Sequence, residues 1–158
     1  MRRRDREITN RQEILNILSR ADICRIALHD DEYPYIVPMN FGFEDNGTLI
    51  LYFHCAVEGR KLDLIRNNNN VGFEVEIDTK MVTGSKACDS TIYYKSVIGC
   101  GSVEIMNSRE DKVHGLDVLM KHFTGKEGFR YEEELLNKMV VLRLTVTKIS
   151  AKSHDVKR

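Results

Sequence analysis

The feature that most constrains this fold is a series of segments in which apolar and polar residues alternate with a period of two. The clearest runs from Val71 to Ile77, and the longest, with two internal glycines, runs from Ser90 to Met106. Such alternation is typical of half-buried strands, because successive side chains of a strand point to opposite faces of the sheet. Further strands are expected over residues 23–28, 33–44, 49–54 and 138–152.

Turn and helix signals separate these segments. Asp45-Asn46-Gly47 is typical of a hairpin turn, since Asn-Gly readily adopts positive φ. Helices are expected over residues 9–20, 60–66, 108–123 and 131–137, the first opened by the capping box Thr9-Asn10-Arg11-Gln12. The order does not alternate as βαβα units would. It therefore predicts a mainly β (α+β) fold, a six-stranded antiparallel sheet closed into a barrel with peripheral helices.

The composition excludes several classes of protein. Lysines plus arginines number 24 and acids number 24 in 158 residues, without the basic excess of a nucleic-acid binder. No apolar run has the length of a membrane span, and the first residues lack the apolar core of a secretory signal. We expect a cytoplasmic protein with a single domain over residues 1–158, of which 1–8 and 151–158 are peripheral tails.

The four cysteines do not form a recognisable framework. Cys24, Cys55, Cys88 and Cys100 include no C-x-x-C pair, so reduced thiols are expected rather than disulfides. A zinc site at His54 and Cys55 would need a distant third ligand, and structural zinc sites usually have closely spaced pairs. No metal site is predicted.

A strand-to-helix junction is the first candidate site. After the strand that ends near His54 come Gly59, Arg60 and Lys61, at the start of a helix. A helix N-terminus has unpaired N–H groups and a partial positive charge, so it favours an anion such as phosphate. The alternative is a solvated basic pair, with His54 as a hydrogen-bonded structural residue.

Two strand segments are further candidates. In "VPMNF", Val37 to Phe41, Pro38 removes a ladder donor, so a flat heterocycle could pair with the strand; the alternative is an edge strand guarded by proline. In "YKSVIGCGSVE", Lys95 and Ser96 could bind anions, and Gly99 and Gly101 allow close approach. The alternative there is a bent barrel strand. The apolar stripe Val113, Leu116, Met120 and Phe123 is interpreted as core.

Together these segments resemble a known family. "MRRRDREIT", "YPYIVPMNFGFE", "LYFHCAVEGRKLDLI" and "YKSVIGCGSVE" stand in the order and at about the separation typical of the pyridoxamine 5'-phosphate oxidase-like, FMN-binding split β-barrel proteins. The branch most similar is the nitroimidazole-resistance (Nim-type) subfamily. The resemblance covers residues 1–150, and "HCAxEGRK" is its most specific part.

The resemblance implies FMN at a homodimer interface. The strand "VPMNF" would contact the isoalloxazine, and the junction would hold the phosphate. The third strand would approach the cofactor from the partner subunit. The cofactor-binding residues implied are Val37, Pro38, Met39, Asn40, Phe41, His54, Ala56, Gly59, Arg60, Lys61, Ser96, Val97 and Gly99.

The implied function is that of an FMN-dependent oxidoreductase. Electrons would pass from a reduced nicotinamide donor to a small acceptor such as a nitroaromatic, and catalytic His54 could donate a proton. The last strand reads Ile149-Ser150-Ala151-Lys152 where many relatives have a T-G-K type segment, and no arginine-rich C-terminal segment is present. Vitamin B6 phosphate is therefore not the expected substrate.

Two other functions stay open at this point. One is a non-catalytic flavin-storage or redox-sensing protein. The other is a haem-binding split barrel, whose iron ligand would be His54 or one of the remaining histidines, namely His29, His114, His122 and His154.

Overall fold

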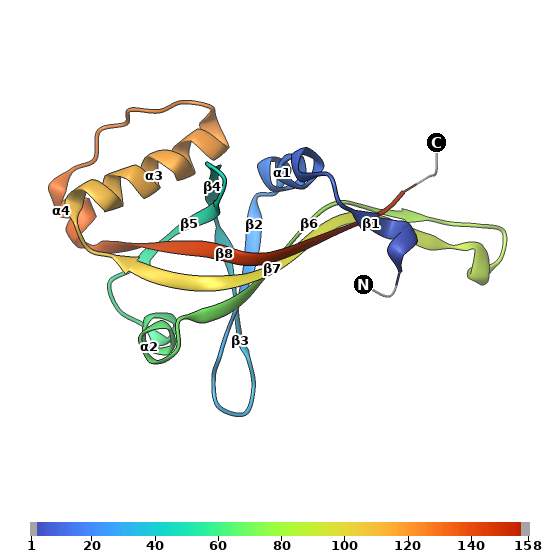
Figure 1. Cartoon of the computed structure of the whole chain (residues 1–158), viewed down its shortest axis with the longest axis horizontal. Coiled ribbons are helices and arrows are strands. Elements are labelled where there is room, and N and C mark those ends of the chain that lie inside the picture. The colour runs from blue at the N-terminus through green and yellow to red at the C-terminus, as the bar shows by residue number, and fades with distance from the viewer. Residues whose placement is uncertain (1–2, 156–158) are drawn as a thin grey trace.

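The computed structural model describes residues 3–155 and contains one antiparallel sheet surrounded by helices (Figure 1). The sheet order is β3-β2-β6-β7-β8-β5-β4, with β1 paired to β8. The strands are β1 Glu7–Ile8, β2 Ile23–Leu28, β3 Tyr35–Asn40, β4 Gly42–Asp45, β5 Leu49–Ala56, β6 Asn70–Val82, β7 Thr91–Met106 and β8 Met139–His154. The helices are η1 Arg4–Arg6, α1 Arg11–Arg20, α2 Arg60–Asn67, η2 Ala87–Asp89, α3 Arg109–Thr124 and α4 Glu133–Asn137.

The sheet curls into a split barrel, as the sequence predicts, with two corrections. It has eight strands among the described residues, because the short β1 and the separate β4 join the six expected. Its hydrogen-bonded path is also open, running from β3 at one end to β4 at the other. These two strands are consecutive in the chain and separated only by Phe41, so the chain itself spans the gap between the edges.

The inner face of the curled sheet forms the main core. Alternation along β5 buries Leu51 and Phe53, and the equivalent positions of β8 bury Leu142 and Leu144. Phe41 is fully buried among them. A second, smaller cluster around Tyr52 and Val141 forms on the outer face, where α3 covers β5 and β8. The pattern of the strands thus separates a closed inner core from an outer face that one helix covers.

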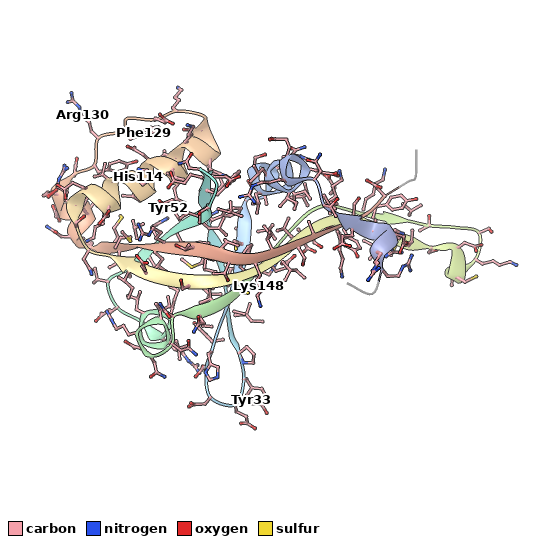
Figure 2. The ribbon with its side chains drawn as sticks, in the orientation of Figure 1. Tyr33, Tyr52, His114, Phe129, Arg130 and Lys148 are labelled. Carbon is pink, nitrogen blue, oxygen red and sulfur yellow. The ribbon has the colours of Figure 1, made fainter. Side chains whose placement is uncertain are left out.

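Helix α3 approaches the sheet closely because glycines stand at the contact. A Cβ on Gly42 would lie 2.5 Å from the Val118 carbonyl oxygen, and one on Gly115 would lie 2.5 Å from Val141 Cγ1. Ser108 caps the helix by accepting a hydrogen bond from the Asp111 N–H at 3.1 Å, and Gly125 ends it in the left-handed conformation. Figure 2 shows Tyr52 beneath the helix and His114 on the helix itself, and their ring centroids lie 5.4 Å apart.

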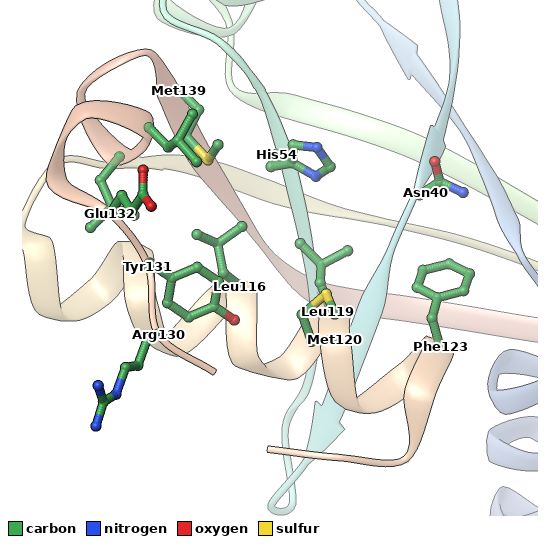
Figure 3. Close-up of a pocket in the computed structure, with 12 residues that line it drawn as sticks. Asn40, His54, Leu116, Leu119, Met120, Phe123, Arg130, Tyr131, Glu132 and Met139 are labelled. Atoms are coloured by element: carbon green, nitrogen blue, oxygen red, sulfur yellow. The ribbon is translucent and has the colours of Figure 1, made fainter. Parts of the chain in front are cut away.

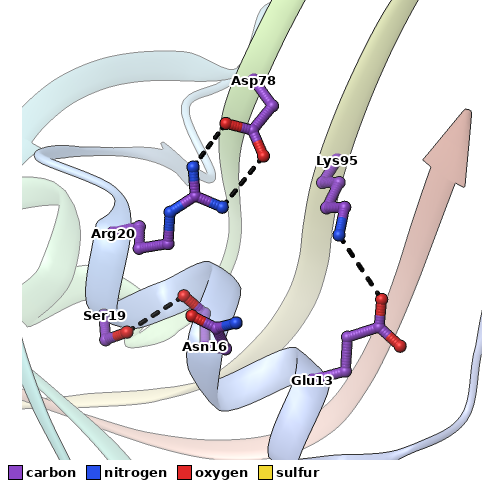
Figure 4. A network of polar contacts seen from close by, with 6 residues as sticks. All are labelled: Glu13, Asn16, Ser19, Arg20, Asp78 and Lys95. Carbon is purple, nitrogen blue, oxygen red and sulfur yellow. Dashed lines mark hydrogen bonds and ion pairs between the residues drawn. The ribbon is translucent and has the colours of Figure 1, made fainter. Parts of the chain in front are cut away.

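Helix α1 lies across β6 and β7 and is held there by polar contacts (Figure 4). Arg20 and Asp78 form a bidentate pair at 2.5 and 2.9 Å, and Lys95 Nζ lies 3.6 Å from Glu13 Oε1. The N-cap is Asn10, whose side chain accepts from the Glu13 N–H at 3.2 Å, and not Thr9. The predicted capping box is therefore displaced by one residue, since Asn is at least as good an N-cap as Thr.

The ends of the described chain belong partly to the sheet. Glu7 and Ile8 pair with Lys152 and Ala151, and both Ile8 and Ala151 are buried. The predicted peripheral tails are thus only partly peripheral, and residues 1–2 and 156–158 lie outside the described part. Strand β6 runs further than the predicted Val71–Ile77, whereas β7 matches its predicted range within one residue. The two strands pair in an arm beyond the barrel, with a register shift between Ile77 and Lys80. Within residues 3–155, no helix combines the length and apolar character needed to cross a membrane.

Candidate functional site

The junction between β5 and α2 has the geometry of an uncapped helix N-terminus. Gly59 is the N-cap, with φ of 133°, a conformation that L-residues rarely adopt. No atom lies within 4 Å of the position that a Cβ would take, so the approach to the backbone is open. No side chain caps the helix, and the Gly59 carbonyl accepts the Leu62 N–H at 2.8 Å. The N–H groups of the first turn can therefore serve an acceptor from outside the chain.

The two cations of the junction have different surroundings. Arg60 pairs with Asp30, and its guanidinium carbon lies 4.9 Å from the ring centroid of Tyr35. Lys61 is half-buried beside Cys55, and among residues 3–155 it forms no ion pair. Burial raises the pKa of the Cys55 thiol, against the opposing effect of the nearby Lys61 ammonium. Lys61 is thus the cation more readily offered to an anion.

These residues fit a phosphate-bearing cofactor. The donor set consists of unpaired N–H groups at a helix start, a cation at the same end, and a glycine that leaves the approach open. Asp30 reduces the positive charge that Arg60 contributes. The set suits one phosphate group.

Strand β3 presents only alternate residues to its outer face. Met39 and Phe41 are buried in the barrel core, and Val37 packs against it. The exposed side chains of the strand are those of Ile36, Pro38 and Asn40. β3 is an edge strand at one end of the path, which fits a proline at this place. A ligand on the outer face would touch Val37, Met39 and Phe41 through their backbone only.

The β7 segment lies away from the junction. Ser96 pairs with Lys152, near the C-terminal end of β8. The junction end of β5 lies at the other end of β8, where Ala56 pairs with Met139. Val97 is fully buried, whereas Ser96 is half-buried. Gly99 has a packing role, because a Cβ there would lie 2.5 Å from the Phe73 ring and 2.7 Å from the Lys148 carbonyl oxygen. Within one chain, the structure does not bring these three predicted residues to the junction.

His54 and Asn40, in contrast, lie on one cavity of about 590 Å³ (Figure 3). His54 is exposed on the outer face of β5, opposite Val141 of β8. Asn40 Nδ2 donates to the Asp22 carbonyl at 3.2 Å, which leaves its Oδ1 as an acceptor. The other lining residues come from α3, α4 and their surroundings: Leu116, Leu119, Met120, Phe123, Arg130, Tyr131, Glu132, Leu135, Leu136 and Met139.

Most of this cavity was missed by sequence reasoning. Leu116 is buried in the outer-face cluster, as the core interpretation of the stripe predicts. Together with Met120 and Phe123 it also lines the cavity, and Phe123 is 44% exposed. The available signal was the apolar stripe itself. Helical periodicity identifies the apolar face of a helix and does not reveal whether protein or a cavity lies against it.

The two helices that line the cavity, α3 and α4, are held in place by polar contacts. Near α4, Tyr131 donates its hydroxyl to Asp117 at 2.9 Å, and burial together with this bond raises the pKa of Tyr131. Near the end of α3, His122 Nε2 lies 2.9 Å from the Ala21 carbonyl oxygen, and its ring centroid lies 5.0 Å from that of Phe41. His122 is therefore half-buried and bonded, not a free surface residue.

The described histidines and cysteines do not form a metal site. No group of three or more metal-ligating side chains occurs in residues 3–155, and the four cysteines are free thiols. His114 contacts Glu44, and His154 Nδ1 lies 2.9 Å from the Ile92 carbonyl oxygen.

The open antiparallel sheet with its peripheral helices defines a split β-barrel protein. The family model described as pyridoxamine 5'-phosphate oxidase matches residues 10–153. The chain belongs to this family.

Solved structures agree with this assignment. A proposed 5-nitroimidazole antibiotic resistance protein from Bacteroides thetaiotaomicron is 33% identical, with a TM-score of 0.81 over 93% of this chain and 86% of that one. A flavocytochrome from Azotobacter vinelandii is 16% identical, with a TM-score of 0.83 over 98% of this chain and 72% of that one. An FAD- and haem-binding protein from Mycobacterium smegmatis is 19% identical, with a TM-score of 0.83 over 95% and 74%. At these lower identities the likeness shows the fold alone.

A curated relative from Rhizobium meliloti matches over a shorter stretch. It is 28% identical over 69 residues, which is 43% of this chain and 42% of that protein. This chain thus matches less than half the length of that relative.

Proposed function

We propose that this protein is an FMN-dependent oxidoreductase that passes electrons from a reduced nicotinamide to a small acceptor such as a nitroaromatic. The observation that carries the proposal is the uncapped start of α2, with Gly59 and Lys61, directly after the strand that presents His54. The similarity to the nitroimidazole-resistance protein supports the choice of acceptor. Vitamin B6 phosphate stays outside the proposal.

The chain's residues would bind and orient the reactants. The α2 N–H groups and Lys61 would hold the phosphate, while Pro38 and Asn40 would contact the ring system from the edge of the sheet. FMN, when bound, would supply the transfer of the electron pair. His54 would donate a proton at the acceptor.

The overall reaction balances in electrons and protons. A nicotinamide gives up a hydride, which amounts to two electrons and one proton. A nitro group takes two electrons and two protons and becomes a nitroso group and water. The second proton comes from solvent and is delivered through the imidazole of His54.

We further propose a homodimer with the FMN between subunits, acting in the cytoplasm, where its four free thiols would stay reduced. The outer face of β3-β2-β6-β7 supports the dimer. Ile36 and Ile98 are 61% and 49% exposed there, and Pro38, Arg25, Glu74 and Ile98 form one cross-strand row. A two-fold related copy would also bring Ser96 and Gly99 toward the junction of its partner, which one chain alone does not.

Anaerobic reduction tests the enzymatic part. Protein loaded with FMN is mixed with NADH or NADPH, and the flavin absorbance is followed before and after addition of a nitroaromatic. The proposal expects bleaching by the nicotinamide and recovery with the acceptor. Flavin that stays oxidised with both donors contradicts it and favours storage or redox sensing.

Haem binding is a second candidate, favoured by one specific observation. His54 lies exposed at an apolar cavity whose volume suits a large planar ligand, and no hydrogen-bond partner holds its ring among the described residues. Haem ligated by His54 would compete with a nitroaromatic for this cavity. The absorption spectrum of the purified protein separates the two.

A further inference from the structure

The cavity beside His54 differs from the phosphate junction in chemistry and place. Its lining does not include Gly59, Arg60 or Lys61. It extends from His54 of β5 and Asn40 of β3 to α3 and α4 (Figure 3). A cofactor phosphate held at α2 would thus leave this space to another molecule or part of one.

The walls of the cavity are apolar and come mostly from two helices. Leu116, Leu119, Met120 and Phe123 of α3 face Leu135 and Leu136 of α4. Methionine and leucine side chains present no hydrogen-bonding groups apart from the weak thioether acceptor of Met120. A ligand that replaces water against these walls gains from its own apolar surface.

The polar groups of the cavity are few and are placed at its ends. His54 and Asn40 lie at the end of the cavity next to the sheet. His54 provides the two nitrogens of its imidazole ring, and Asn40 provides its Oδ1 as a hydrogen-bond acceptor. The Tyr131 hydroxyl donates to Asp117, so Tyr131 can contact a ligand through its aromatic ring. Arg130 and Glu132 carry opposite charges, which cancel, and Figure 3 shows the Arg130 guanidinium directed away from the other lining side chains.

We infer that this cavity binds an uncharged, mostly apolar ring compound, with its single polar end against His54 and Asn40. The inference rests on the proposed function for the role of that compound as electron acceptor, but the binding itself does not. An anionic ligand is disfavoured, because its ionised group would be desolvated against apolar walls, and the guanidinium of the lining residue Arg130 is directed away from them. The site thus selects by charge and ring size, independently of the phosphate junction.

Direct binding to the flavin-free protein tests the inference. The probes are 1-nitronaphthalene and its charged analogue 4-nitro-1-naphthoate, measured by equilibrium dialysis. Leu135→Glu places a charge on the wall at a residue that is 51% exposed, so folding should be retained. Asn137→Glu is the matched control, with the same charge on the same helix outside the lining.

The expected result is binding of the uncharged probe and about tenfold weaker binding of the naphthoate. Leu135→Glu should weaken the uncharged probe by about tenfold, while Asn137→Glu leaves it unchanged. Met120→Trp, which narrows the cavity with a larger side chain, should also weaken binding of the uncharged probe. Equal binding of both probes, or equal losses in Leu135→Glu and Asn137→Glu, would overturn the inference.

FMN titrations of the same variants separate the two proposals. FMN affinity should be the same in Leu135→Glu, Asn137→Glu and the parent protein. A selective loss of FMN affinity in Leu135→Glu would show that the cavity holds the flavin ring, which overturns the inference while leaving the proposed function. Probe binding with the expected pattern in a protein that takes up no FMN would support the cavity and refute the proposed function.

Discussion

Arg60 and Lys61 are neighbours in the sequence, but the structure gives them different partners. Arg60 is engaged by Asp30 and Tyr35, whereas Lys61 stands beside a neutral thiol. A cation already paired with a carboxylate contributes less to an incoming phosphate than one without such a pair. The sequence alone treats the two residues as equivalent.

Lys61→Ala is therefore expected to weaken FMN binding by about 10- to 100-fold, or roughly 1.4–2.8 kcal/mol. Arg60→Ala should have a smaller effect, because Asp30 already offsets its charge. Fluorescence titration of FMN into the flavin-free protein gives both affinities, with Lys80→Ala on the arm as a control. Unchanged affinity in Lys61→Ala would remove this residue from the phosphate site.

His54→Asn should lower turnover far more than flavin affinity. Asparagine retains a hydrogen-bonding group near the size of the imidazole but cannot serve as a proton donor of suitable pKa. Turnover with a nitro acceptor and the FMN dissociation constant are measured on the same preparation. A parallel fall in both would assign His54 to holding the cofactor.

Cys24 should make the free energy of unfolding depend on pH in the alkaline range. Burial raises the pKa of its thiol from 9.0 to about 12. Between pH 9 and pH 12 the Cys24 thiol is deprotonated in the unfolded chain but stays protonated in the folded chain. The free energy of unfolding therefore falls as the pH rises above 9. The free energy of unfolding should fall by about 1.3 kcal/mol more in the parent than in Cys24→Ala between pH 8 and pH 10. Urea unfolding at the two pH values gives this difference. An equal fall in the parent protein and in Cys24→Ala would contradict the role given to Cys24.

Among the elements, α3 links the fold to the cavity. It packs closely on β4 at Gly42 and on the sheet through its own Gly115, and four of its side chains form part of the cavity wall. Interiors are packed too tightly to absorb an added methyl group against a backbone carbonyl without a shift. The position of this cavity wall is therefore set by two small residues outside the cavity.

Gly42→Ala should lower the free energy of unfolding by about 1–3 kcal/mol, because its Cβ would lie 2.5 Å from the Val118 carbonyl oxygen. Gly72→Ala is the matched control, since a Cβ there would meet only ordinary contacts at 3.9 Å. Chemical denaturation measures both. A loss in Gly42→Ala no larger than that in Gly72→Ala would show that α3 tolerates the shift.

The elements also show how far the sequence can predict this structure. Alternation places the strands correctly, because one face of each is buried in the core. It does not predict that β6 continues through the irregular Asp78 to Val82, since the arm has little core to bury. The junction was recognisable because Gly59 and its neighbours adjoin each other in the chain. The cavity was not recognisable, because its lining residues come from β3, β5, α3 and the α4 region, which are separate in the sequence and meet only in the folded chain.

Gly99 shows why a motif can be identified without its role being predictable. A glycine within a strand is compatible with either a ligand or a bulky neighbour approaching the backbone. The register pairs Gly99 with Phe73, whose ring occupies the space of the missing side chain. Only the pairing of β6 with β7 makes that distinction.

For the whole molecule, the proposed dimer accounts for features that one chain leaves unexplained. The outer face of β3-β2-β6-β7 exposes isoleucines, and the β7 segment lies two strands from β3. Tyr33, at the tip of the β2–β3 hairpin, is also highly exposed (Figure 2). Exposed apolar groups gathered on one face are typical of an interface.

Ile98→Glu should shift the protein toward the monomer and release flavin, because the charge would be buried between subunits. Sedimentation velocity and bound-flavin absorbance follow the two effects together. Asn137→Glu, on α4, is the control and should remain dimeric. A monomeric Ile98→Glu that keeps its flavin would show that one chain holds the cofactor alone.

The central claim is that this split barrel carries FMN, and the absorption spectrum of the freshly purified protein tests it most directly. The chromophore is released by denaturation and identified by its mass. We expect flavin bands and the mass of FMN. A strong haem band, or a colourless protein that takes up no added FMN, would contradict the claim.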